Sequence, residues 1–202
     1  LDKTGYITSE SLLKLEKLPK SIVVIGGGYI AAEYGFFLSM MGADVKIIGR
    51  NPQFVPNEEP EISEVLKNKL SKYMNIYTGF EAVSTKNKLG NKIVTAKNKE
   101  GKTIDIKAKE LLVATGRKSN FEYLKPKRTG VQTDDHGWIK VNKNLETSKE
   151  NIWAMGDAIG KHMFKHVANY EAEIVYHNAF GKRNREVDYH AVPHAIFTYP
   201  EV

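Results

Sequence analysis

The amino-acid sequence predicts an α/β protein in which helices, a parallel sheet and an antiparallel meander form three layers. The first observation is the apolar run at residues 22–25, which is typical of a buried strand and precedes three consecutive glycines and a helical pattern. The second is the continued alternation of helical and strand patterns up to residue 77. The third is a group of three alternating runs within residues 80–108, separated by glycine-containing turns. Together these features predict a Rossmann-like fold.

The elements of the first half follow one another closely. A helix is expected over residues 29–41, with Gly42 after its last turn, and a second strand over residues 45–48. A proline-containing interruption comes next, and a short third strand is expected at residues 75–77. Between them, apolar residues recur at helical spacing and predict a second helix: Ile62, Val65, Leu66, Leu70 and Tyr73.

The meander and a last buried strand complete this region. Glycine-containing turns at residues 89–91 and 100–102 predict two hairpins, and residues 111–114 predict a final strand of the parallel sheet. The pattern becomes polar from residue 117 to about residue 131, which marks a domain boundary.

The region beyond this boundary is predicted to form a second unit. Its expected elements are strands near residues 138–141 and 152–154 and a helix near residues 167–180.

Composition limits the classes of protein that the chain can belong to. Its 202 residues are 41% hydrophobic, which is enough for a folded core. No run of 18 apolar residues occurs, so no membrane association is expected. Cysteine is absent, which excludes disulfides and thiolate metal sites and favours a cytoplasmic location. The net charge of +6 comes from lysines scattered among acidic residues, which favours a solvated surface over a nucleic-acid site.

The glycine turn is the strongest functional signal in the sequence. Gly26 and Gly28 allow a tight turn and the close approach of a ligand, and the small Ala31 allows the helix to pack against the strand. Free amide groups and the positive end of the helix dipole then face the turn. A purely structural turn is the alternative, but a strand before the turn and a helix after it favour binding of a dinucleotide pyrophosphate.

The end of the second strand predicts which dinucleotide is preferred. In NAD-binding folds an acidic residue at this point accepts hydrogen bonds from the adenosine ribose, but here the position is Gly49. Arg50 follows, and its planar guanidinium suits a 2′-phosphate. The resemblance to an enzyme family set out below implies a second arginine near Pro56 in some NADPH-using members, and it is missing here. NADP(H) is therefore favoured over NAD(H), with a merely solvated Arg50 as the alternative.

Motifs along the whole chain resemble the class I pyridine nucleotide–disulfide oxidoreductases, which use FAD and NAD(P). The resemblance is carried, in order, by residues 26–33, 114–117, 147–157, 165–172 and 192–201. Within the family the chain is most similar to dihydrolipoamide dehydrogenase and mycothione reductase, and a mercuric or glutathione-type reductase is the alternative. The resemblance implies hydride transfer between NAD(P)H and FAD.

The resemblance also implies roles for particular residues. Tyr29 would cover the flavin face and move aside for the nicotinamide, and Glu33 would lie beside that ring; packing and a helix-dipole contact are the alternatives. Asp157, after Gly156 at a strand end, would bind a ribityl hydroxyl or else cap a helix. The predicted cofactor-binding residues are Gly26, Gly27, Gly28, Tyr29, Ile30, Glu33, Gly49, Arg50, Thr115, Gly116, Arg117, Gly156, Asp157, His166, Val167 and Ala168.

No catalytic residue or metal ligand is assigned. His162 and His166 stand four residues apart, but no third ligand has a matching spacing. The family's cysteine pair and acid–base histidine have no counterpart, so the chain is expected to be an inactive central fragment of a homodimeric FAD enzyme. Its expected parts are a flavin-domain end and linker (1–19), an NAD(P)-binding domain (20–118), half of an FAD-binding domain (119–190) and the start of a dimerisation domain (191–202).

Three other interpretations remain open. The chain could be a stand-alone dinucleotide-binding module, although the motif at Asp157 argues against it. It could belong to a related flavoenzyme of the NADH oxidase or ferredoxin reductase type, which residues 197–200 argue against. It could bind nucleic acid, which a salt-dependent gel shift would reveal.

Overall fold

The structure is a computed structural model and describes residues 4–181 and 184–202 of the chain. It forms two compact units, which are described separately. Unit 1 comprises Leu1–Gly116 together with Ala195–Val202, and unit 2 comprises Arg117–His194. The division falls close to the boundary expected after residue 118, whereas residues 195–202 cluster with unit 1. The assignment of these segments to cofactor domains stays a prediction.

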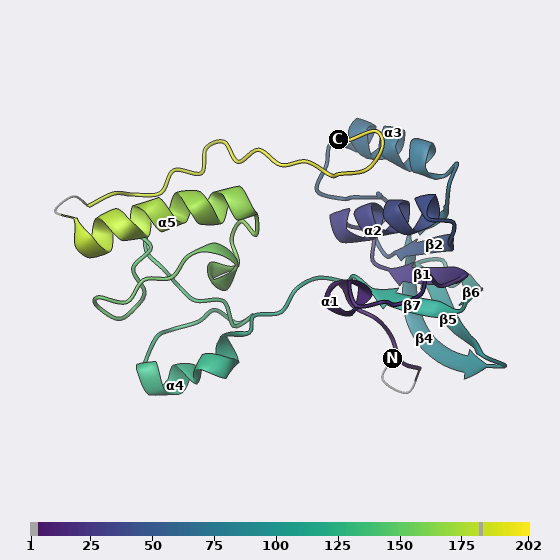
Figure 1. Cartoon of the computed structure of the whole chain (residues 1–202), viewed down its shortest axis with the longest axis horizontal. Helices are drawn as coiled ribbons and strands as arrows, with labels where there is room; N and C mark the ends of the chain where they lie inside the picture. Colours follow the sequence, from purple (N-terminus) through teal and green to yellow (C-terminus); the bar gives the residue numbers. More distant parts are fainter. Residues whose placement is uncertain (1–3, 182–183) are drawn as a thin grey trace. The chain divides into compact units, whose positions relative to one another are not determined.

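The central sheet of unit 1 is parallel and has the strand order β3-β2-β1-β7 (Figure 1). Strand β1 lies between β2 and β7, with Ile22 opposite Val45 on one side and Glu110 on the other. Because β1 has neighbours at both edges and is covered on both faces, its residues 22–25 are buried. The strands are β1 (Ser21–Ile25), β2 (Asp44–Gly49), β3 (Asn75–Thr78) and β7 (Glu110–Val113).

Helices α2 (Tyr29–Met40) and α3 (Pro60–Leu70) cover one face of the sheet. Leu38 of α2 and Leu66 of α3 belong to the same buried cluster as Val24 of the sheet. Since side chains alternate between the two faces of a strand, β1 contributes Val24 to the helical side and Val23 to the other side.

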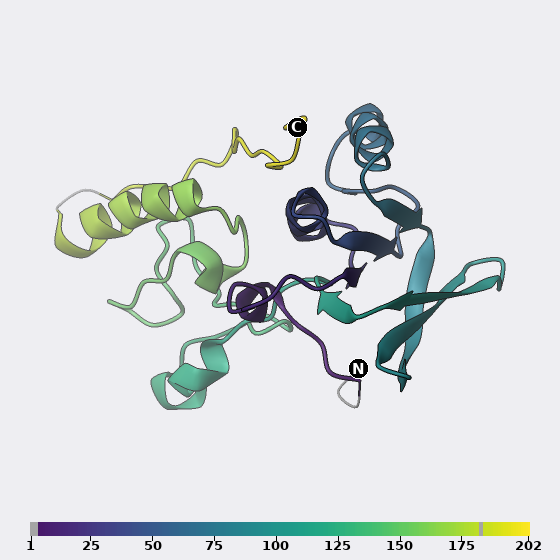
Figure 2. The same ribbon diagram turned by 45° about the vertical axis from the view of Figure 1, so that its right-hand side comes forward.

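An antiparallel sheet covers the opposite face and provides the third layer (Figure 2). Val94 and Ile106 of this sheet pack in one cluster with Val23 of β1. Helices, parallel sheet and meander therefore form three layers, which confirms the predicted fold class. The strands of the meander are β4 (Phe80–Lys88), β5 (Asn91–Asn98) and β6 (Thr103–Ala108), in the order β4-β5-β6.

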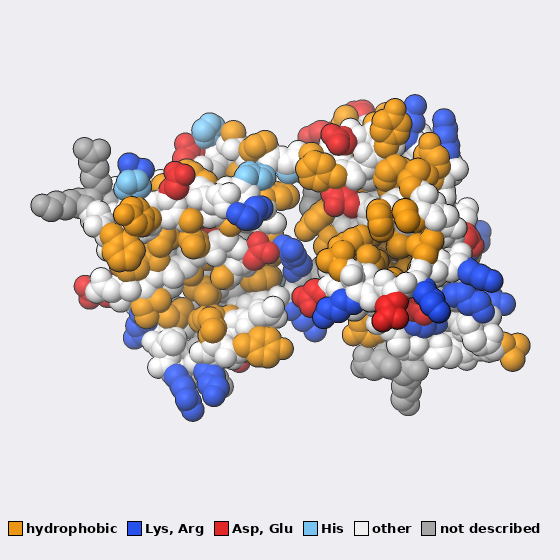
Figure 3. Space-filling view, viewed as in Figure 1, with side chains coloured by type: hydrophobic (Ala, Val, Ile, Leu, Met, Phe, Trp, Pro, Cys, Tyr) orange, Lys and Arg blue, Asp and Glu red, His pale blue; other side chains and the backbone are white. Residues whose placement is uncertain are grey.

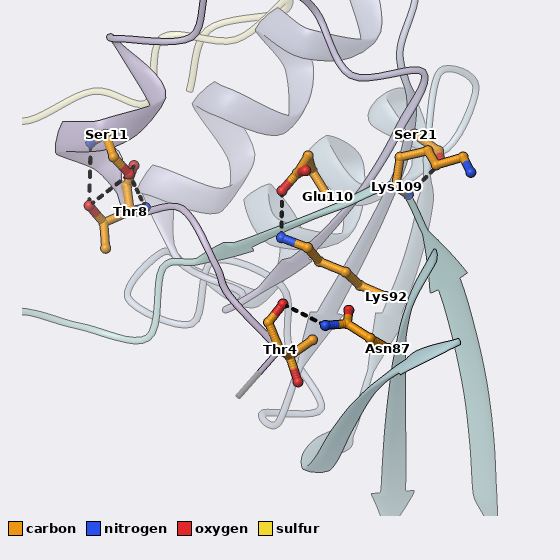
Figure 4. Close-up of polar contacts among 8 residues, drawn as sticks. All are labelled: Thr4, Thr8, Ser11, Ser21, Asn87, Lys92, Lys109 and Glu110. Carbon is orange, nitrogen blue, oxygen red and sulfur yellow. Dashed lines mark hydrogen bonds and ion pairs between the residues drawn. The ribbon is translucent and has the colours of Figure 1, made fainter. Parts of the chain in front are cut away.

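Polar contacts join the two sheets (Figure 4). The Lys92 ammonium of β5 donates to the carboxylate of Glu110 in β7 over 2.7 Å. The backbone N–H of Lys109, just before β7, donates to the hydroxyl of Ser21 at the start of β1 over 3.0 Å. These contacts hold the end of the meander in register with the parallel sheet.

The first described residues also pack on unit 1. Asn87 of β4 donates to the carbonyl of Thr4 over 3.2 Å (Figure 4), and Ile7 forms a parallel bridge with Leu112 of β7. A capping box at Thr8 then begins the short helix α1 (Ser9–Leu12). The segment therefore covers the free edge of β7.

Helix α3 forms in the predicted segment, but it ends at Leu70, before Tyr73, and buries a different face. Ile62, Val65 and Tyr73 are 43%, 51% and 46% exposed, whereas Ser63 is buried together with the leucines of the helix. The hydroxyl of Ser63 donates to the carbonyl of Phe54, which satisfies a polar group on the inner face. Hydrophobic side chains consequently gather on the surface over α2 and α3 (Figure 3).

Unit 2 is less regular than the sequence predicted. Across its described residues, the strands expected near residues 138–141 and 152–154 are replaced by isolated bridges, so this prediction was wrong. Side chains bind the backbone on both sides of the first segment. Asp134 and Asn142 each accept two backbone N–H groups of the turn that follows them, including that of Trp138, which competes with regular strand pairing there.

The predicted C-terminal helix of unit 2 is confirmed as α5 (Lys165–Phe180). A small core forms around Val131, Ile139 and Ala154. The ring of Trp138 lies against Gly160, where a Cβ would come within 2.3 Å of the ring. The other short elements are η1 (Phe121–Leu124), α4 (Pro126–Thr129) and η2 (Gly156–Ile159). Among helices in the described ranges, none has the length and hydropathy needed to cross a membrane.

Candidate dinucleotide site

The glycine turn after β1 is tightly packed on one side and open on the other. Gly26 has a φ of 137°, and a Cβ there would lie 2.3 Å from the carbonyl oxygen of Ala114. A Cβ on Gly27 would lie 3.2 Å from the Cα of Gly49 in β2. By contrast, a Cβ on Gly28 would meet no atom within 4 Å. The turn therefore leaves space for a ligand beside Gly28.

Helix α2 begins directly at this open side. Gly28 is the N-cap, and no side chain of the described residues forms a cap hydrogen bond there. The first-turn amides, including those of Tyr29 and Ile30, can therefore bind an anion, which the positive end of the helix dipole also favours. Ala31 is fully buried, so α2 packs close to the sheet. The arrangement fits a pyrophosphate.

Tyr29 and Glu33 lie on the opening turns of α2. The side chain of Tyr29 is 37% exposed, and the Oε1 atom of Glu33 accepts the backbone N–H of Phe197 over 3.0 Å. Phe197 follows Ile196, which is buried in the core of unit 1. No pattern in the sequence indicates a contact between residues so far apart. The roles of Tyr29 and Glu33 beside a nicotinamide stay predictions.

The end of β2 lies next to the glycine turn. Gly49 is its last residue and is buried against Gly27, so no carboxylate occupies this position. Arg50 follows as an exposed side chain. Among the described residues it takes part in no ion pair.

The loop after β2 returns to the glycine turn. The backbone N–H of Val55 donates to the carbonyl of Gly27 over 2.7 Å. Val55 has a φ of 43°, in the left-handed region that a β-branched residue rarely adopts. Val55 and Phe54 are both buried and hold the loop in this conformation. Sequence reasoning missed this contact, because only the fold brings the loop and the turn together.

The predicted residues of unit 1 thus converge at one edge of its sheet. Gly26, Gly49 and Thr115 each lie at or just after the carboxyl end of a parallel strand, which is where ligands bind in open α/β sheets. Thr115 and Gly116 are exposed after β7, and Gly116 has a φ of 131°.

The predicted residues of unit 2 gather around η2. Arg117 donates to the carboxylate of Asp157 over 2.7 Å, and both side chains are partly exposed. A Cβ on Gly156 would lie 3.1 Å from that of Ala168 in α5. The expectation that Asp157 ends a strand was wrong, because the backbone turns into η2 at Gly156, which has a φ of 64°. Nor is Asp157 the N-cap of this turn, since Met155 is.

Glu171 organises this part of unit 2, and the sequence prediction missed its role. Its side chain is fully buried in α5. One carboxylate oxygen accepts the backbone N–H of Gly156 and the other accepts the hydroxyl of Tyr189, both over 2.5 Å. The signal was present, because Glu171 lies between Val167 and Ile174 on the buried stripe of the helix.

Aromatic rings surround the start of α5. The exposed His166 stacks on Phe164 at a centroid distance of 5.5 Å, and Phe164 stacks on His194 at 5.6 Å. His166 also lines a groove of about 350 Å³ with Tyr170 and Tyr189. Within the described ranges, no three His, Asp or Glu side chains are placed to hold a metal ion.

The partly buried environment of Tyr189 predicts a pH-dependent stability. Burial, followed by the hydrogen bond to Glu171, raises the pKa of Tyr189 above its ordinary value of about 10. A raised folded-state pKa gives stability that is present below the unfolded-state pKa and is lost as the pH rises through the folded-state value. Above about pH 10 we therefore expect the Tm of unit 2 to fall more steeply in the wild type than in Tyr189→Phe.

Tryptophan fluorescence measures this effect in unit 2, because Trp138 and Trp153 are the only tryptophans of the chain and both belong to that unit. Tyr176→Phe is the matched control, since it removes a tyrosine hydroxyl from a position of α5 that is 63% exposed. If Tm fell equally steeply with rising pH in the wild type and in Tyr189→Phe, the prediction would be contradicted.

Comparison with known proteins agrees with this geometry. Residues 2–172 match the family model described as pyridine nucleotide-disulphide oxidoreductase. A dihydrolipoyl dehydrogenase of Synechocystis is 36% identical over 212 residues, covering all of this chain and 44% of the relative. A mercuric reductase of Lysinibacillus sphaericus is 37% identical over 205 residues, covering all of this chain and 37% of the relative.

A solved structure is similar as well. The HOCl-induced flavoprotein disulfide reductase RclA from Escherichia coli superposes with a TM-score of 0.87 at 27% identity, over 98% of this chain and 45% of that protein. The chain thus spans less than half the length of each of these relatives.

Proposed function

Because the chain belongs to the pyridine nucleotide–disulphide oxidoreductase family, we propose that unit 1 binds a nicotinamide dinucleotide and that unit 2 contributes to an FAD site. The observation that carries the proposal is the open, uncapped start of α2 beside Gly28. Its amide groups and helix dipole suit a pyrophosphate, and Gly28 presents no side chain to block it.

The residues of the chain would bind and orient the cofactors, while the nicotinamide and flavin rings supply the hydride chemistry. Tyr29 offers a partly exposed aromatic ring one residue after the turn and would exclude water from the nicotinamide region. Glu33 would orient the carboxamide; its contact with Phe197 uses only part of its capacity as a hydrogen-bond acceptor.

In unit 2, Asp157 would accept a hydrogen bond from a ribityl hydroxyl. Its carboxylate is 56% exposed and shares only one oxygen with Arg117, which leaves acceptor capacity for a ligand. His166, Val167 and Ala168 would place the N-terminal end of α5 near the flavin, where the helix dipole favours negative charge.

The proposed activity of the whole protein is that of an FAD-dependent, NAD(P)-linked disulfide oxidoreductase, with a homodimer as its assembly. Similar identities to a dihydrolipoyl dehydrogenase and to a mercuric reductase support the class of reaction and favour neither substrate.

NADP(H) is the proposed nicotinamide cofactor. Gly49 leaves the ribose position without a negative charge, and the exposed Arg50 can pair with a 2′-phosphate. Titration calorimetry should therefore show that the chain binds NADPH more tightly than NADH. A charge-assisted contact contributes about 1.5–3 kcal/mol, so Arg50→Ala should weaken NADPH about tenfold or more.

The variant Gly49→Glu with Arg50→Ala should reverse the preference, since it restores an acceptor for the ribose hydroxyls and repels a phosphate. A Cβ at Gly49 would lie 3.2 Å from the Cα of Gly27, so the glycine turn must shift by a few tenths of an ångström, and circular dichroism should first show that the variant is folded. Equal affinities for NADPH and NADH in the wild type would refute the cofactor preference.

A further inference from the structure

Lys67 is a lysine of α3 whose ammonium is held at the carboxyl edge of the sheet. Its side chain is half-buried, and Nζ donates to the hydroxyl of Thr78 over 2.7 Å. Thr78 is the last residue of β3. An ammonium has three donors, so this hydrogen bond leaves two for a ligand. Across the described residues, Lys67 takes part in no ion pair.

The register of the sheet places this ammonium beside the predicted ribose position. Thr78 of β3 is paired with Gly49 of β2, and neighbouring strands lie about 4.8 Å apart. Paired residues present their side chains to the same face of a sheet, and at Gly49 that direction leads to Gly27 of the glycine turn. Lys67 therefore reaches the same face and the same edge as the turn.

Arg50 approaches this edge from a different element. It follows Gly49, and the two strand ends continue together, because Gly79 donates its N–H to the carbonyl of Asn51 over 2.9 Å. Lys67 of α3 and Arg50, the residue after β2, thus belong to segments that meet at this edge, where Gly49 brings no carboxylate. This arrangement suits a compact dianion attached to the ribose.

We propose that Lys67 is the second cation of a 2′-phosphate site that it forms with Arg50. The inference rests on the proposed preference for NADP(H) and assigns to α3 the charge that is missing at Pro56. Lys67 would be a specificity-determining residue, since it would contact only the phosphate that distinguishes the two cofactors. Lys67 would not increase the affinity for NADH, which lacks that phosphate.

Titration calorimetry of the whole chain with NADPH and with NADH tests the proposal. Lys67→Met should weaken NADPH about tenfold and leave NADH within about twofold. Lys67→Arg, which keeps the charge, should retain most of the preference. Lys69→Met is the matched control, because it removes the same charge from an exposed position of α3 and should change neither affinity.

The outcomes separate this inference from the proposal on which it rests. A wild-type preference for NADPH that survives Lys67→Met overturns the role of Lys67 and leaves the role of Arg50 intact. Equal weakening of both cofactors also overturns it, because Lys67 would then support the fold. A wild-type chain without any preference for NADPH overturns the cofactor proposal, and this inference with it.

Discussion

Replacing Gly26 by alanine is expected to destabilise unit 1 by roughly 2–6 kcal/mol, the combined cost of a strained backbone and an overpacked contact. The added Cβ would lie 2.3 Å from the carbonyl oxygen of Ala114, and a φ of 137° is a conformation for glycine alone. Neither the close contact nor the φ angle can relax at low energetic cost, because both involve the backbone at the ends of β1 and β7. Amide hydrogen exchange of residues 21–25 measures the loss.

Gly28→Ala is the matched control two residues away. Its Cβ would meet nothing within 4 Å, and its φ of −93° is accessible to alanine. We expect the protection of β1 to be kept, while the proposed dinucleotide is bound more weakly because a methyl group enters its space. Equal protection of β1 in both variants would contradict the packing argument at Gly26.

Replacing Glu171 by alanine should have a comparable effect on unit 2. The change leaves the buried N–H of Gly156 and the hydroxyl of Tyr189 without their acceptor. An unsatisfied buried group costs about 1–3 kcal/mol, and the N–H of Gly156 is buried whereas the hydroxyl of Tyr189 is only partly buried, so unit 2 should lose at least roughly 1–3 kcal/mol. Urea unfolding followed by the fluorescence of Trp138 and Trp153 measures the free energy of unfolding of this unit.

Two further variants identify the cause. Glu173→Ala removes an exposed glutamate from the same helix and should change the free energy of unfolding by less than about 0.5 kcal/mol. Glu171→Gln keeps the size of the side chain and one oxygen acceptor, so its loss should lie between the other two. An alanine variant as stable as the Glu173 control would show that the two hydrogen bonds contribute nothing to stability.

The sequence predicted unit 1 well because its elements are long and periodic. Strand β1 and the turn at Gly26 combine an apolar run, a glycine requirement and a helix start within a few residues. The inner face of α3 was harder to predict. Ser63 is buried because the carbonyl of Phe54 offers it a partner, and helical spacing alone cannot indicate such a partner.

Unit 2 shows why the remainder could not be predicted. Its segment near Trp138 has the apolar content of a strand, but the side chain of Asp134 accepts the backbone N–H of Trp138. The candidate site also depends on a contact that the sequence does not indicate. The contact from Glu171 to Gly156 joins residues on different elements, and only the fold brings them together.

The order of strands in the parallel sheet has a consequence for the time at which unit 1 can form during synthesis. Strand β2, one neighbour of β1, follows it in the chain after about 20 residues. The other neighbour is β7, whose Glu110 pairs with Ile22 across 88 residues of chain. At a synthesis rate of about 5–20 residues per second, that edge of β1 waits roughly 4–18 s for its partner. An apolar strand with a free edge can pair wrongly during this delay, so the nascent chain is most exposed to aggregation before β7 has been made.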